Sequence, residues 1–392
     1  MFAIGTQLGL TRESKRCSNS SDRHVAKDLA MNGVLMSTPT ATDLVKRLGL
    51  TKPLIVAPMA GGPSSTELVA AVSNAGAMGS MGAAYSNADG IAEFAAKVRT
   101  MSDKPFAINL FAPQPVQQAT ESKVTRAIAA TDKFRKELEL PTPQLPLQFT
   151  APYAQDFDSQ FEAVLRAKPA VLSFVFGRLD LKYVKAAQSA KIFVMGTATT
   201  FNEARELEGS GVHAIILQGI EAGGHRATFD PTGDDPAFGM MALLQGCRGK
   251  IKIPLIAAGG IMTAEHINQA LANGAQAVQM GTAFLTCREA GTSAPYKAKL
   301  LESSKRITKT TRVFSGRLAR SIENRFMREM DAATILPFPL QSSFTRDLRA
   351  ASLAKNSSDF ISLWAGTGEG ALWQGSVVEL IDTLFVPSAP TL

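Results

Sequence analysis

Cysteine is scarce in this sequence of 392 residues, and the three cysteines, Cys17, Cys247 and Cys287, have neither a CxxC spacing nor the spacing of metal ligands. This pattern argues against a disulfide framework, so we expect reduced thiols, a cytoplasmic protein and no metal site. Long apolar runs are also missing, and none approaches the roughly eighteen residues that a membrane-spanning helix needs. Residues 1–35 lack the apolar segment of a secretory signal, and we interpret them as a disordered tail.

Acidic residues are outnumbered, with 34 aspartates and glutamates against 41 lysines and arginines and a formal net charge of +7. The excess lies in the N-terminal stretch and between residues 305 and 328. No basic motif is interleaved with aromatic residues, as base stacking would require. We therefore expect anionic small molecules as partners, no nucleic acid, no membrane, and a solvated basic face. A monomer and a homodimer are both compatible with the sequence.

From residue 53 onward, short β-rich runs alternate with helical patterns. Eight such runs follow one another, at residues 53–60, 77–85, 105–111, 170–177, 191–198, 213–218, 253–261 and 277–285. They are almost continuously apolar, as parallel strands covered on both faces should be. The pattern predicts an α/β fold, a (β/α)₈ TIM barrel. An open doubly wound sheet is the alternative, but it would need a GxGxxG turn after the first strand, and residues 60–63 (AGGP) do not supply one.

Two segments do not fit this repeat. Residues 112–169 carry repeated prolines and two helical patterns, and we expect an insertion or lid over the barrel. Residues 291–392 are mostly helical and too long for the eighth helix alone. We expect them to pack with the insertion as a small helical second domain, leaving residues 36–111 and 170–290 as the barrel.

The loops at the carboxyl ends of the strands build the active site in this fold. Two glycine turns, Gly259-Gly260 and Gly281-Thr282, occupy the ends of the last two strands. They let backbone N–H groups approach an anion, which predicts a phosphate site; taken singly, each pair could simply make a tight turn.

The sixth strand is followed by Gly223-Gly224-His225, which places an imidazole over the barrel mouth. Because histidine suits proton transfer near neutral pH, we predict that His225 is catalytic, and that His213 and His266 are structural.

Other strand ends offer contacts to a flat ring with polar edges. Ala57-Pro58-Met59 supplies an apolar platform, and Asn109 and Gln218 supply amide donors and acceptors. A ring of this kind tethered to a phosphate fits FMN better than a nicotinamide, for which no dinucleotide fingerprint is present. The predicted FMN-binding residues are Ala57, Pro58, Met59, Asn109, Gln218, Gly223, Gly224, Gly259, Gly260, Gln279, Met280, Gly281 and Thr282.

Together these residues resemble the nitronate monooxygenases of class I, formerly called 2-nitropropane dioxygenases, over residues 42–375. The resemblance rests on residues 57–59 (APM), 104–111 (KPFAINLF), 173–177 (SFVFG), 218–226 (QGIEAGGHR), 257–261 (AAGGI), 279–284 (QMGTAF), 315–320 (SGRLAR) and 364–366 (WAG). One departure is Ala227, where the family usually has glycine. The resemblance implies FMN-dependent oxidation of alkyl nitronates, such as propionate 3-nitronate, by dioxygen, and thus detoxification of nitro compounds. It also implies catalysis by His225 and a substrate contact at Tyr296.

Three alternatives stay open at this point. A flavin-dependent enoyl reductase shares the barrel and residues 221–225 (EAGGH), although the motif at residues 315–320 argues against it. An NAD(P)H:quinone reductase is a related option. A flavin carrier without catalysis is the third, and the polar groups at the strand ends make it the weakest.

Overall fold

Eight parallel strands form the centre of the computed structural model, which describes residues 42–115, 117–147, 153, 155–302, 306–330 and 332–385. They are β1 (Leu54–Val56), β2 (Gly79–Gly82), β3 (Phe106–Phe111), β4 (Val171–Val175), β5 (Phe193–Ala198), β6 (Ala214–Gln218), β8 (Leu255–Ala258) and β9 (Ala277–Met280). Each lies within one of the eight predicted runs. The predicted tail of residues 1–35 lies outside the described residues.

The sheet closes into a barrel. Its strands follow the order β1-β9-β8-β6-β5-β4-β3-β2, so that β1 and β2 stand at the two ends of the order. A parallel bridge between Ile55 and Met78 joins these ends, with Val56 N–H donating to the Met78 carbonyl at 2.9 Å. The TIM barrel is therefore confirmed.

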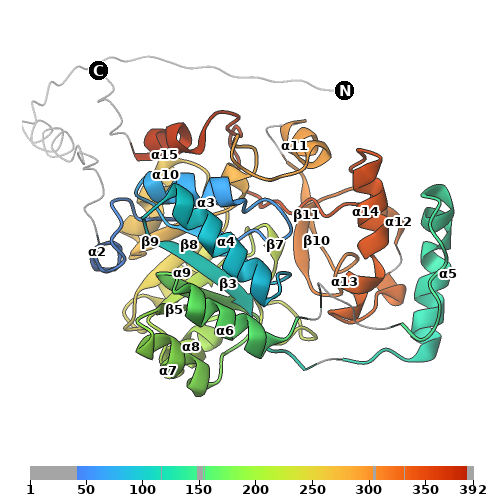
Figure 1. Ribbon diagram of the computed structural model, residues 1–392, viewed down its shortest axis with the longest axis horizontal. Helices are drawn as coiled ribbons and strands as arrows, with labels where there is room; N and C mark the ends of the chain where they lie inside the picture. The colour runs from blue at the N-terminus through green and yellow to red at the C-terminus, as the bar shows by residue number, and fades with distance from the viewer. Residues whose placement is uncertain are drawn as a thin grey trace, which may run out of the picture. The chain divides into compact units, whose positions relative to one another are not determined.

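Helices surround the strands (Figure 1). They are α3 (Thr66–Asn74), α4 (Ala88–Met101), α6 (Phe157–Ala167), α7 (Leu181–Ser189), α8 (Phe201–Gly209), α9 (Met240–Cys247), α10 (Ala264–Ala272) and α15 (Val377–Phe385). Several begin at a polar residue whose side chain accepts a backbone N–H of the first turn, as Ser65, Asn87 and Thr263 do. At Thr200 the helix start is a full capping box with Glu203.

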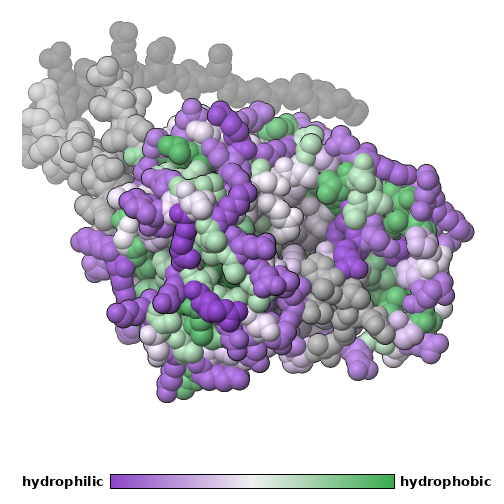
Figure 2. All heavy atoms as spheres, in the orientation of Figure 1, coloured by the Kyte–Doolittle hydropathy of each residue, from purple (hydrophilic) through white to green (hydrophobic). Residues whose placement is uncertain are grey.

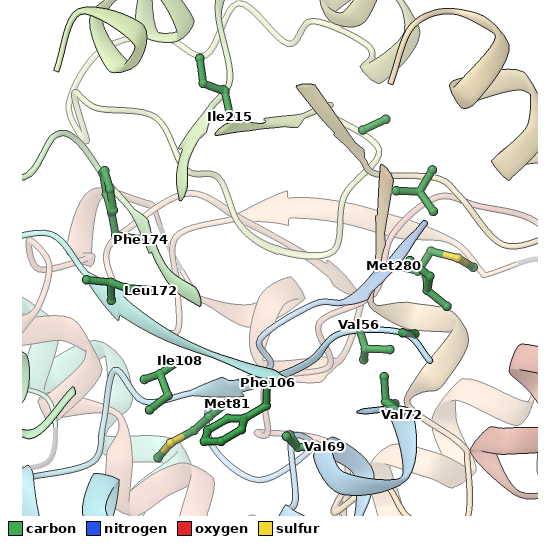
Figure 3. Packing of buried hydrophobic residues seen from close by; sticks show 14 of the residues in the cluster. Val56, Val69, Val72, Met81, Phe106, Ile108, Leu172, Phe174, Ile215 and Met280 are labelled. Carbon is green, nitrogen blue, oxygen red and sulfur yellow. The ribbon is translucent and has the colours of Figure 1, made fainter. Parts of the chain in front are cut away.

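Alternation along the strands divides the core into two layers. One layer lies between strands and helices, where Phe106 and Ile108 of β3 and Val69 and Val72 of α3 belong to the same cluster (Figure 3). The other cluster contains the intervening strand residues, such as Ile216 of β6. Leu44, from the short helix α2 (Asp43–Arg47), belongs to this second cluster and packs with it.

Helix α5 (Glu121–Glu137) packs away from the barrel, against the C-terminal region. That region contains α11 (Ala294–Leu301), α12 (Arg325–Glu329), η2 (Ala332–Thr334), α13 (Leu340–Phe344) and α14 (Arg346–Ala354). Phe134 of α5 lies in one buried cluster with Phe326 and Phe360, and Arg135 pairs with Asp347 at 2.5 Å between Nη1 and Oδ2. By contrast, α6 packs against α4 of the barrel.

The range 112–169, expected as one insertion, therefore holds two helices with different neighbours. The C-terminal region is also divided, because α15 packs against α3 and α10 of the barrel. All described residues fall within one unit, Pro39–Val386. A separate small helical domain is thus still a proposal.

A second, antiparallel sheet was not predicted. It consists of β10 (Thr308–Thr311), β11 (Ala319–Ile322) and β7 (Gly224–His225), with His225 opposite Ala319 and Gly224 opposite Arg320. In the sequence, these residues form a basic stretch and a glycine turn. A two-residue strand such as β7 has no periodicity by which it could be recognised. This sheet ties the loop after β6 to the C-terminal region.

Hydrophilic residues cover most of the face shown in Figure 2, and apolar ones gather over the region of α14. None of the helices in the described ranges is long and apolar enough to cross a membrane.

Candidate active site

A cavity of about 570 Å³ lies at the carboxyl ends of the barrel strands. Its size is typical of small-molecule and cofactor sites. Every residue predicted from the sequence as catalytic, cofactor-binding or substrate-binding lines it, although the predictions came from strand ends spread over more than 200 positions. The closure of the barrel explains this, because it brings all eight carboxyl ends to one rim.

His225 lies half-buried in the cavity wall, at the end of β7. Three aromatic rings surround its imidazole, those of Phe111, Phe176 and Trp364, with centroid distances of 6.4, 5.9 and 5.2 Å. Burial, together with the positive charges of Arg317 and Arg349, lowers the pKa of His225 to about 3. The ring is therefore neutral near pH 7 and has one nitrogen that can accept a proton.

Ser315 is the hydrogen-bond partner of this imidazole. Its Oγ lies 2.7 Å from His225 Nε2, and the same Oγ accepts the backbone N–H of Arg317 at 3.2 Å. The side chain is buried, so the contact is shielded from bulk water. Sequence reasoning used Ser315 only as part of a motif and assigned it no role.

The turn before His225 is shaped by close packing. Gly224 has φ +77°, and a Cβ built on Gly223 would lie 2.6 Å from the backbone of Ala365, so a larger residue would displace the segment beyond it. Glu221, in the same motif, accepts the backbone N–H of Met240 at 2.9 Å. This bond pairs one of the N–H groups that the first turn of α9 leaves without a helical partner. The glutamate of this motif is therefore structural, a role that the sequence did not reveal.

Two glycine turns also line the cavity. Gly260 has φ +73°, a conformation that favours glycine, while Gly281 has an ordinary φ of −116°. Among the described residues, the backbone N–H groups of Gly260 and Gly281 donate to no backbone acceptor. Unpaired N–H groups at a cavity wall can bind the oxygens of an anion, as the sequence predicted for a phosphate.

Amide side chains complete the polar lining. Asn109 donates from Nδ2 to Ser173 Oγ at 3.0 Å, and Gln218 donates from Nε2 to the His225 carbonyl at 3.0 Å. Ala227, where the resemblance expects glycine, donates its N–H to Gln218 Oε1 at 2.9 Å and is not among the positive-φ residues. Alanine therefore fits this loop without backbone strain.

Tyr296 lines the cavity, but its hydroxyl donates to the Trp364 carbonyl. Burial raises the pKa of Tyr296 far above its usual value, so the hydroxyl stays protonated. Its contact with a substrate stays a prediction. Cys287 is buried, and burial raises the pKa of its thiol to about 12, which makes it a poor nucleophile near neutral pH.

One part of the cavity wall, made of aromatic and basic side chains, was not predicted from the sequence. The rings of Tyr85 and Tyr153 lie 4.8 Å apart between centroids, and Arg349 donates from Nη2 to the Tyr153 hydroxyl at 2.6 Å. Arg346 lines the same cavity from α14. These residues come from three distant segments, and no local pattern relates them.

Four arginines of the basic stretch donate to backbone carbonyls within the molecule, so the expectation of a solvated face is wrong for this part of the stretch: Arg306, Arg312, Arg317 and Arg320. Arg317 is buried, with its guanidinium carbon 3.8 Å from the centre of the Phe176 ring. Arg312 donates to the Pro231 carbonyl and Arg320 to the Ile220 carbonyl, both at 2.8 Å. These cations hold loops together around the site.

Comparisons with known proteins show the family of the chain. The family described as nitronate monooxygenase matches residues 42–386. The nitronate monooxygenase of Paraburkholderia phytofirmans is 38% identical over 347 residues, 87% of this chain and 93% of that protein. The probable nitronate monooxygenase of Bacillus subtilis is 36% identical over 347 residues, 87% of this chain and 97% of that protein.

Solved structures show the same likeness. A nitroalkane oxidase from Streptomyces ansochromogenes superposes with a TM-score of 0.81 and 34% identity, covering 87% of this chain and 96% of that one. FabK from Thermotoga maritima, with a TM-score of 0.67 and 24% identity over 88% of this chain and 94% of its own, shares the fold. The chain therefore belongs to the nitronate monooxygenase family of oxidoreductases.

Proposed function

We propose that this protein is an FMN-dependent nitronate monooxygenase that oxidises alkyl nitronates, such as propionate 3-nitronate, with dioxygen and so detoxifies nitro compounds. The observation that carries the proposal is the neutral imidazole of His225 in the wall of a cavity that also has unpaired N–H groups. Membership of the family supports the type of reaction.

The residues around the cavity fit FMN. The N–H groups of Gly260 and Gly281 can receive a phosphate, and Asn109 and Gln218 offer polar contacts to a ring edge. Met59 supplies apolar surface for a ring face. When bound, FMN would accept electrons from the substrate and pass them to dioxygen.

His225 would remove the carbon-bound proton from a neutral nitroalkane. A nitrogen of a neutral imidazole accepts that proton, and the rings of Phe176 and Trp364 border the imidazole. A preformed nitronate has already lost the proton, so it requires binding and electron transfer alone. The positive charges of Arg346 and Arg349 at the same cavity favour an anionic substrate.

Anaerobic mixing tests the proposal. The FMN-loaded protein is mixed with propionate 3-nitronate and, separately, with NADPH, and the flavin absorbance is followed. We expect the nitronate to bleach the flavin and NADPH to leave it oxidised. Bleaching by NADPH alone would identify a reductase of the enoyl or quinone type, and bleaching by neither would point to a flavin carrier.

A further inference from the structure

The hydrogen bonds of Gln218 leave it only one kind of contact to offer. Its Oε1 accepts Nη1 of Arg226 and the N–H of Ala227, both at 2.9 Å, and its Nε2 donates to the His225 carbonyl at 3.0 Å. An amide oxygen has two lone pairs, and both are used here. The one remaining capacity is the second N–H of Nε2, on a side chain that lines the cavity.

The partners also decide which way the amide points. A guanidinium and a backbone N–H only donate, and the His225 carbonyl only accepts. Rotating the Gln218 amide by 180° would place its NH₂ against two donors and its oxygen against an acceptor. The orientation is therefore determined by the network, with Arg226 as its one charged member.

Arg226 is held rigidly. Its side chain is fully buried, its Nε lies 2.6 Å from Asp235 Oδ2, and its Nη1 also donates to the Gly219 carbonyl at 2.8 Å. Burial raises the pKa of Asp235, but the hydrogen bonds from Arg226 and from the Ala237 N–H outweigh it and leave the pKa below its usual value. Separating the two side chains would leave a buried charge unpaired, at a high cost in free energy. The guanidinium is therefore held beside Asp235.

We propose that Arg226, held by Asp235, is a positioning residue that makes Gln218 a hydrogen-bond donor toward the cofactor. The side chain then selects acceptor atoms at the edge of the flavin ring and stabilises the ring more as electrons add negative charge to that edge. The inference rests on the proposed FMN dependence. It assigns the site a polarity that the identity of Gln218 alone does not determine, because a glutamine can donate or accept.

A pair of substitutions at Gln218 tests this polarity. Gln218→Met removes the donor at similar size, and we expect FMN affinity, measured by titration of flavin fluorescence, to fall about tenfold, as for one lost hydrogen bond. Gln218→Glu replaces the donor by a carboxylate oxygen, and we expect a larger loss and an altered flavin absorbance spectrum. Gln269→Met, on the exposed face of α10, is the control and should change neither. If Gln218→Glu binds FMN as tightly as the wild type, Gln218 is not a donor.

A double-mutant cycle tests the role of Arg226. Arg226→Lys keeps the charge but loses the forked geometry, so it should weaken FMN binding in the wild-type background and add nothing to Gln218→Met. Equal losses in both backgrounds would overturn the positioning role.

If Arg226→Lys does not fold, Asp235→Asn, which keeps the size of the side chain and one oxygen that can accept from the guanidinium, takes its place in the cycle. A wild-type protein that takes up no FMN would overturn the proposed function itself, whereas tight FMN binding with additive variants would overturn this inference alone.

Discussion

His225 Nε2 lies 2.7 Å from Ser315 Oγ, across 90 positions of sequence. The two residues meet because β7 pairs with β11, and Ser315 lies just ahead of β11. The contact orients the imidazole, and the role of the serine as donor or acceptor decides which ring nitrogen carries the proton.

Replacing Ser315 by alanine should therefore reduce turnover without releasing the cofactor. The net value of one hydrogen bond predicts a fall of about three- to tenfold in kcat/KM for a neutral nitroalkane. FMN affinity should be unchanged, because the proposed FMN contacts are made by other residues. Steady-state kinetics and an FMN titration on the same preparation check both halves. Loss of FMN from Ser315→Ala would show that the serine supports the cofactor instead.

His225→Asn distinguishes proton transfer from electrostatic binding. Asparagine has a hydrogen-bonding group of similar size but takes no proton near neutral pH. Turnover of a neutral nitroalkane should fall by about 10²–10⁴-fold, the usual loss for a missing general base. Oxidation of the preformed nitronate should fall much less. Rates with both substrates should be measured beside a His213→Asn control, whose ring accepts the Val194 N–H and lines no part of the cavity. Small, equal losses with both substrates would mean that His225 is structural.

The low pKa of His225 also predicts how stability depends on pH. In the unfolded chain this histidine has a pKa near 6.5, and in the folded protein about 3. Between these values the unfolded state binds more protons, so the contribution of His225 to the free energy of unfolding is lost as the pH falls below about 6.5. His225→Asn lacks this dependence.

Urea unfolding of the wild type and of His225→Asn between pH 7 and pH 4, with the same excess of FMN, measures the effect. The wild type should lose stability relative to the variant as the solution becomes more acidic. Parallel profiles would show that the folded protein does not depress this pKa.

Gly281→Asp tests the phosphate site without straining the backbone. Gly281 has an ordinary φ of −116°, and an added Cβ would lie 3.5 Å from Cβ of Ala57, which is normal contact. A carboxylate there should repel a phosphate, whereas Gly281→Asn has the same shape without the charge. We expect the aspartate variant to lose at least tenfold more FMN affinity than the asparagine variant. Equal affinities would place the phosphate elsewhere in the cavity.

Local patterns in the sequence were sufficient for the barrel and for one half of the site. The run at residues 170–177 is apolar and bounded by turns, and it contains β4. Gly259-Gly260 and Gly281-Thr282 were recognised because they follow such runs and the fold brings strand ends together. The spacing of apolar residues and the residue types of turns are properties of short segments, so they can be recognised without coordinates.

The other half of the site was decided by tertiary structure. The pairing of His225 with Ser315, the contact of Arg349 with Tyr153, and the role of Glu221 in capping α9 each join segments that have no common local pattern. The same holds for Arg312 and Arg320 of the basic stretch, which turn inward because carbonyls of distant loops lie within their reach. Composition alone determined that the chain is basic and poor in cysteine. Only the packing of distant segments decided which of its charges are buried. Burial of a charged side chain depends on the segments that pack against it in the folded protein, and not on its neighbours in the chain.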